Sequence, residues 1–146
     1  MERRAIGSDT FEKINGLLFC TDPDSTLYND NLTVWKENVD AIEYFQSKGG
    51  LFTFITGRVR KTATYIYQTI KPNAPYGCIN GCGIYDGDND AYLWMVELPR
   101  TVLELVRAVD EQMPDMGIQF NTANGIWFCK DSVFTPTRPS PRISPS

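Results

Sequence analysis

The sequence predicts an α/β protein built on a partial Rossmann-like parallel sheet, followed by the beginning of a smaller α+β unit. Short apolar runs end in turn-forming residues, and segments with helical spacing lie between them. This alternation is typical of parallel strands joined by right-handed crossover helices. After residue 82 the pattern changes to hairpins around one helix. A chain of 146 residues with 42% hydrophobic residues is long enough to bury a core of its own.

The first strand is expected over residues 16–21, where an apolar run reaches Thr21 and then two acids, Asp22 and Asp24. An apolar run of this length bounded by turn residues predicts a buried strand. Its carboxyl end would carry Asp22, and open α/β sheets bind their ligands at that edge. An acidic turn is the alternative interpretation of the two acids. Residues 1–15 are expected to be a loose lead-in.

Two further strand and helix pairs are predicted next. A helix over 33–48, capped by Asn31 or Thr33, should stop at the glycines 49–50. A second buried strand is expected over 51–55 and a helix over 59–70, which Lys71-Pro72 must end. A third short strand is expected over 76–79.

The remainder of the chain predicts hairpins and one more helix. The expected hairpins pair 83–86 with 91–96 and 118–122 with 126–130, the second around an Asn-Gly turn at 124–125. A helix is expected over 98–113, with Pro99 near its start. Residues 135–146 are rich in Pro, Ser and Arg and are expected to be a disordered tail.

Composition narrows the classes of function. The net charge of −4 argues against a nucleic-acid surface, which is normally basic. The chain shows neither a run long enough to span a bilayer nor a secretory signal, so no membrane partner is expected. Four cysteines without a histidine argue against a zinc site and favour a reducing compartment, the cytoplasm. Cys20, Cys78 and Cys129 are predicted to be buried thiols because they lie in or beside apolar stretches.

Three segments resemble one known family. Asp22-Pro23-Asp24-Ser25-Thr26-Leu27 is similar to the Asp-x-Asp-Gly-Thr-Leu motif of the haloacid dehalogenase-like (HAD) phosphatases. Phe54-Ile55-Thr56-Gly57-Arg58 resembles the second motif of their Cof-type branch, and Asn80-Gly81-Cys82-Gly83-Ile84-Tyr85-Asp86 resembles a later segment of it. The resemblance implies that residues 16–96 form the N-terminal part of a HAD-like core and that residues 97–134 form part of an α/β cap.

The resemblance also implies a chemistry. Asp22 would attack a phosphate ester as nucleophile and form an aspartyl-phosphate, and Asp24 would act as general acid and then as base. The carboxylate of Asp22 and the main-chain carbonyl of Asp24 would hold Mg²⁺. Thr56, Gly57, Arg58 and Asn80 would lie at the substrate, a small phosphorylated metabolite such as a sugar phosphate. From the residues alone, Thr56-Gly57-Arg58 is equally compatible with a helix N-cap beside a solvated Arg.

The chain also departs from the family pattern. Ser25 replaces the glycine of the first motif, and the phosphate-binding Lys and late acids of the family have no counterpart. The segment 87–90, Gly-Asp-Asn-Asp, imitates the late motif but is interpreted as a hairpin turn. We therefore expect a chain truncated in the cap. Two alternatives to an active phosphatase stay open: a catalytically deficient fragment of one, and an unrelated doubly wound binding module such as a receiver-like or nucleotide-binding domain.

Overall fold

The computed structural model describes residues 14–130, so the predicted tail and almost all of the predicted lead-in lie outside it. Along the described chain the elements are β1 (Leu18–Thr21), the irregular turn η1 (Pro23–Leu27), α2 (Lys36–Ser47), β2 (Leu51–Phe54), α3 (Arg60–Ile70), β3 (Tyr76–Cys78), η2 (Ile79–Gly81), β4 (Gly83–Asp86), β5 (Ala91–Met95), α4 (Val102–Gln112), β6 (Ile118–Thr122) and β7 (Gly125–Lys130). The predicted order of strands and helices is confirmed.

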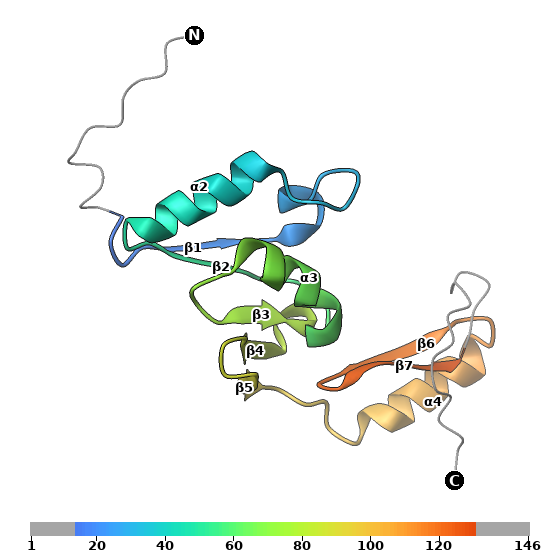
Figure 1. Ribbon diagram of the computed structural model, residues 1–146. Coiled ribbons are helices and arrows are strands. Elements are labelled where there is room, and N and C mark those ends of the chain that lie inside the picture. The colour runs from blue at the N-terminus through green and yellow to red at the C-terminus, as the bar shows by residue number, and fades with distance from the viewer. Residues whose placement is uncertain (1–13, 131–146) are drawn as a thin grey trace.

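The strands β1 to β5 follow one another in space as they do in sequence (Figure 1). β1 pairs with β2 in parallel over its whole length. A parallel bridge between Ile55 and Gly77 joins the end of β2 to β3, and β3, β4 and β5 are antiparallel. The fold is therefore a mixed α/β arrangement that begins as a parallel sheet, as predicted, and continues as an antiparallel meander.

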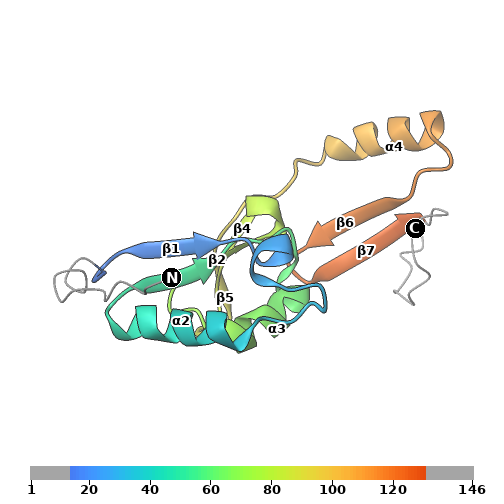
Figure 2. The ribbon, with the colours of Figure 1, turned by 90° about the horizontal axis from the view of Figure 1, so that it is seen from above.

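The helices α2 and α3 lie on the same side of these strands (Figure 2). The side chains that they cover alternate along the strands, as the period of a strand requires. Aromatic rings dominate this inner face: Phe54 stacks on Tyr76 at 4.5 Å between ring centroids, and Tyr76 contacts Tyr85 at 5.6 Å. Ala63, Ile66 and Ile70 of α3 are fully buried against them. The core thus lies between the inner face and the two helices.

The opposite face of β1 and β2 is exposed, and this corrects the prediction of a buried first strand. On this face Leu18, Leu51 and Ile55 are 59%, 40% and 52% exposed, although Thr53 between the last two is buried. Phe19 of β1 points toward α2 and is still 55% exposed. Among residues 14–130, β1 pairs only with β2 and is an edge strand. The apolar run correctly located the strand, but burial depends on neighbours that a local pattern does not contain. The predictions for two thiols are also wrong, because Cys20 of β1 and Cys129 of β7 are exposed, whereas Cys78 is buried as predicted.

The start of α2 also differs from the prediction. The residue before the helix is Trp35, which makes no side-chain cap. The predicted caps Asn31 and Thr33 belong instead to the preceding loop, where their backbone N–H groups both donate to Oδ1 of Asn29, at 3.0 and 3.1 Å. Asn29 therefore organises the polar loop, and the helix begins after it.

The helix α4 and the hairpin β6–β7 project to one side of the sheet in both views (Figures 1 and 2). Ile126, next to the hairpin turn, packs against the core. Lys130 of β7 forms an ion pair with Asp110 of α4, which ties the helix to the hairpin. Within the described range no helix is both long enough and apolar enough to cross a membrane.

Candidate active site

The two acids of the first motif lie immediately after β1, at the carboxyl end of the strand. Asp22 keeps an extended backbone (φ −85°, ψ 133°), and its Oδ1 accepts a hydrogen bond from the backbone N–H of Asp24 at 3.1 Å. Asp22 is exposed, whereas Pro23 beside it is buried. The sequence therefore does form an acidic turn, which lies at the carboxyl edge of the parallel strands, the edge at which open α/β sheets generally bind ligands.

Ser25 occupies the motif position at which the family carries glycine. Its φ of 59° and ψ of 9° lie in the left-handed region, which costs a residue with a side chain about 1–2 kcal/mol relative to right-handed geometry. The turn η1 needs this conformation to return the chain toward Tyr28, whose backbone N–H donates to the carbonyl of Pro23 at 2.9 Å. The need for glycine at this position is thus visible in the backbone, and Ser25 meets it under strain.

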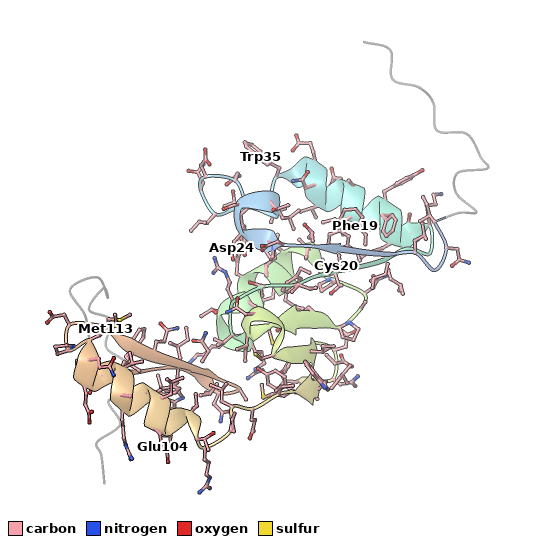
Figure 3. The ribbon with its side chains drawn as sticks, turned by 180° about the vertical axis from the view of Figure 1, so that it is seen from behind. Phe19, Cys20, Asp24, Trp35, Glu104 and Met113 are labelled. Atoms are coloured by element: carbon pink, nitrogen blue, oxygen red, sulfur yellow. The ribbon has the colours of Figure 1, made fainter. Side chains whose placement is uncertain are left out.

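Asp24 is held by Arg58 in a two-point ion pair. The guanidinium Nε and Nη2 donate to the two carboxylate oxygens at 2.9 and 2.6 Å. This hydrogen bonding lowers the pKa of Asp24 below its usual value, although partial burial opposes the shift. The Tyr28 ring lies 5.6 Å from the guanidinium and adds a cation–π contact. Figure 3 shows Asp24 beyond the end of β1. The pair fastens the loop after β1 to the loop after β2.

Thr56 lies at the end of β2 and is buried. Its Oγ1 accepts from the backbone N–H of Arg58 at 3.2 Å, and its own N–H donates to the carbonyl of Gly77 at 3.0 Å. The helix α3 begins at Arg60, after Val59 in the cap position without a side-chain cap. Thr56 is therefore not the helix cap, and Arg58 is held in an ion pair although its side chain stays 35% exposed, so the N-cap interpretation of this segment is wrong.

Asn80 approaches the same loop from η2. Its backbone N–H donates to the carbonyl of Thr56 at 3.3 Å. A Cβ on Gly57 would lie 2.6 Å from Oδ1 of Asn80, so any larger residue at this position would have to displace the Asn80 side chain. Ile79, Asn80 and Gly81 all have positive φ, at 54°, 54° and 87°. A β-branched residue such as Ile79 rarely adopts this geometry, and such strain concentrates at functional sites.

The structure thus brings together most of the residues that the sequence analysis selected. Asp24 contacts Arg58, and beside them Asn80 is hydrogen-bonded to Thr56 and lies close against Gly57. Within the described residues, the side chain of Asp22 contacts only the backbone of its own turn. Sequence reasoning missed the ion pair between the general acid candidate and Arg58. The opposite charges at the ends of two adjacent strands were the signal that could have revealed it.

Asp22 and Asp24 offer the kind of oxygen donor that Mg²⁺ prefers, but too few of them to complete a site. Carboxylate and carbonyl oxygens suit this hard ion, which is often held by one or two carboxylates with water and phosphate oxygens. Between residues 14 and 130, no group of three or more His, Cys, Asp or Glu side chains is placed to hold a metal ion. Asp22 and Asp24 therefore offer a partial site.

The acidic turn of the β4–β5 hairpin is structural, as predicted. Asp86 accepts from the backbone N–H groups of Asp88 and Asn89 at 3.0 and 3.1 Å. Asp88 accepts from the Tyr67 hydroxyl at 2.7 Å, and Asp90 pairs with Arg60 at 2.6 Å. Each carboxylate thus stabilises the turn or fastens it to α3, and the resemblance of this segment to a late family motif is coincidental.

Comparison with known proteins identifies relatives. Residues 19–142 match the model of a family described as haloacid dehalogenase-like hydrolase. A HAD-superfamily phosphatase from Bacteroides thetaiotaomicron superposes with a TM-score of 0.69 at 15% identity, over 90% of this chain and 47% of its own. A protein from Thermotoga maritima superposes with a TM-score of 0.63 at 22% identity, over 80% of this chain and 43% of its own.

A sugar phosphatase of HAD subclass IIB has a TM-score of 0.66 at 18% identity, covering 80% of this chain and 45% of its own. The chain therefore spans less than half the length of these three solved structures. A search of curated proteins found no match.

Proposed function

The chain belongs to the haloacid dehalogenase-like hydrolases, and from this membership we propose that it carries the nucleophile of a Mg²⁺-dependent phosphoric monoester hydrolase. Asp22 attacks the phosphorus of a small phosphorylated metabolite, and the ester oxygen leaves as the aspartyl-phosphate forms. Water then cleaves the intermediate. Membership in this family removes the unrelated binding module from the alternatives.

The ion pair between Asp24 and Arg58 is the observation that supports this assignment best. It places the proposed acid–base carboxylate within one hydrogen-bonded unit with Arg58, between loops that resemble two motifs of the family. In this arrangement Asp24 is ionised, which is the form that accepts a proton from water. To donate a proton to the leaving oxygen, Asp24 has first to separate from Arg58 and take up a proton from solvent. The substrate phosphate is the anion that would attract Arg58 away from it.

The loop of Thr56, Gly57 and Asn80 would receive the phosphoryl oxygens. Gly57 leaves its backbone accessible, and the Asn80 amide lies directly beside it. Mg²⁺, when bound by Asp22 and the main-chain carbonyl of Asp24, would offset the repulsion between the two anions. A sugar phosphate is the proposed substrate class, by analogy with the subclass IIB sugar phosphatase that the fold resembles. The four cysteines, all free thiols, suit the cytoplasm as the proposed compartment.

A deficient fragment of such an enzyme is the second candidate. The metal site favours it, since among the described residues Asp22 and Asp24 have no third acid, His or Cys beside them to complete it. In that case Asp22, Thr56, Gly57 and Asn80 keep the positions given above, but the chain binds Mg²⁺ weakly and hydrolyses no phosphate ester.

One assay separates the two candidates. The purified chain is incubated with Mg²⁺ and a generic aryl phosphate, in parallel with Asp22→Asn and with Asp30→Asn as a control at an exposed acid outside the site. Turnover that is lost in Asp22→Asn and kept in Asp30→Asn supports the phosphatase. No turnover, together with weak Mg²⁺ binding, rejects it in favour of the fragment.

A further inference from the structure

Tyr28 lies directly after the first motif and is fixed there by its backbone and by its burial. Its backbone N–H donates to the carbonyl of Pro23 at 2.9 Å, and the residue forms an antiparallel bridge with Val34. Tyr28 is only 9% exposed and belongs to the core. Its ring therefore cannot leave its neighbours unless the loop after β1 opens.

The Tyr28 ring contacts a cation and a second aromatic ring. The centre of the Arg58 guanidinium lies 5.6 Å from the centroid of the Tyr28 ring. Tyr65 of α3 stacks on the same ring, with 6.2 Å between the centroids and 17° between the planes. A guanidinium at this distance from a ring is attracted by the negative charge on the ring face. Tyr65 thus supports the ring that attracts Arg58.

The same guanidinium makes both hydrogen bonds to Asp24, through Nε and Nη2. The side chains of Arg58 and Asp24 are partly exposed, so water competes for each of them. Holding a long arginine side chain in one geometry also costs rotamer entropy, which weakens exposed ion pairs. A ring that fixes the guanidinium beforehand reduces this cost, because less freedom is left to lose when the pair forms.

We propose that Tyr28 is a positioning residue of the candidate site: its ring holds the Arg58 guanidinium where both hydrogen bonds to Asp24 can form. The importance of this position for catalysis rests on the proposed function, in which Asp24 is the acid–base group. If Tyr28 only fills the core, an apolar side chain of similar size should replace it without effect on Arg58.

Hydrogen exchange at Nε of Arg58 tests the proposal, because this N–H donates to Asp24 and exchanges with water when the pair opens. The full chain is isotope-labelled at its arginines, and the NMR signal is identified by its loss in Arg58→Gln. In Tyr28→Leu the exchange should become about fivefold faster, as expected for the loss of one cation–π contact. Tyr28→Phe keeps the ring and should exchange as the wild type does.

Two controls separate positioning from packing alone. Arg60 lies 5.3 Å from the centroid of the Tyr85 ring, so its Nε–H should exchange at the same rate in every Tyr28 variant. Tyr67→Leu removes another tyrosine that packs against the same core and should leave the exchange at Arg58 unchanged. Exchange at Arg58 that is unaffected by Tyr28→Leu, or accelerated equally by Tyr67→Leu, overturns the proposal.

Fluorination keeps the test decisive if Tyr28→Leu does not fold. Fluorine atoms added to the ring of Tyr28→Phe leave its size nearly unchanged and weaken the attraction of its face for a cation. Exchange at Nε of Arg58 should accelerate with each added fluorine, and a rate that is independent of fluorination overturns the proposal. The measurement needs no substrate, so its result stands whether or not the chain hydrolyses phosphate esters.

Discussion

At the scale of single residues, the charge state of the candidate site depends on the contact between Asp24 and Arg58. The guanidinium keeps Asp24 ionised and holds its pKa below the usual range. Both side chains are partly exposed, so solvent limits the stabilisation to about 1 kcal/mol or less. The pair therefore positions two loops more than it stabilises the fold.

Arg58→Gln should reduce the free energy of unfolding at pH 7 by about 0.5–1 kcal/mol. Because the folded-state pKa of Asp24 is lowered, this stabilisation is present above its unfolded-state pKa of about 4 and is lost as the pH falls through the folded-state pKa. Urea titrations between pH 7 and pH 2.5 should show the wild type and variant converging in acid. Arg107→Gln removes the same charge on α4 and should show no such convergence.

Gly57 and Asn80 should behave as a coupled pair. Gly57→Ala introduces a Cβ at 2.6 Å from Oδ1 of Asn80, so the amide has to move. The expected cost in unfolding free energy is about 1 kcal/mol, because a flexible side chain rather than backbone yields. In an Asn80→Gly background, which keeps the left-handed backbone permissible, the same change should cost little. A double-mutant cycle by chemical denaturation measures the coupling, and strict additivity would contradict the described contact.

Sequence reasoning selected the residues of the site but not how they contact one another. The motif resemblance indicated Asp22, Asp24, Thr56, Gly57, Arg58 and Asn80. It could not show that Arg58 pairs with Asp24, because that contact depends on the relative placement of two strand ends. The strain at Ser25 was foreseeable from the missing glycine, whereas the positive φ of Ile79 had no signal in the sequence.

At the scale of elements, strands and helices were predicted well because each carries its own periodicity. The helix predicted over 59–70 is α3, and both predicted hairpins form. The failures were the burial of β1 and the cap of α2. Burial is a property of neighbouring elements, which a local pattern does not contain. The cap prediction failed because the Asn29 side chain accepts the backbone N–H groups of Asn31 and Thr33, which holds both residues in the loop before the helix.

The helices α3 and α4 should differ in how much they contribute to the free energy of unfolding. Ile66 of α3 is fully buried, so Ile66→Ala should cost about 3 kcal/mol through lost burial and the cavity left behind. Val106 on α4 is only half-buried, and no residue of that helix is fully buried. Val106→Ala should therefore cost about 1 kcal/mol. Equal losses in thermal or chemical denaturation would contradict this difference in burial between α3 and α4.

At the scale of the whole molecule, residues 14–130 form a fold with one covered face and one open face. The inner face holds the aromatic core under α2 and α3. The opposite face, which we call the outer face, exposes apolar side chains that include Leu18, Ile84 and Trp94. An exposed apolar surface of this kind marks an interaction site or an aggregation hazard. This openness, rather than the chemistry of the site, sets the solution behaviour expected of the isolated chain.

The double variant Leu18→Lys, Ile84→Lys should raise the solubility of the isolated chain. Since both side chains are already exposed, the unfolding free energy should change by no more than about 0.5 kcal/mol. Light scattering at increasing concentration, alongside chemical denaturation, checks both expectations. A large loss of stability would mean that the outer face is already packed in the chain on its own.

The most direct test of the proposed function is the position of a trapped phosphoryl group. The chain is incubated with Mg²⁺ and acetyl phosphate, quenched in acid, digested and mapped by mass spectrometry, with Asp22→Asn in parallel. We predict one phosphoryl group on Asp22 that is absent from the variant. A phosphoryl group on another residue, or none on the wild-type chain, would contradict the assignment of Asp22 as the nucleophile.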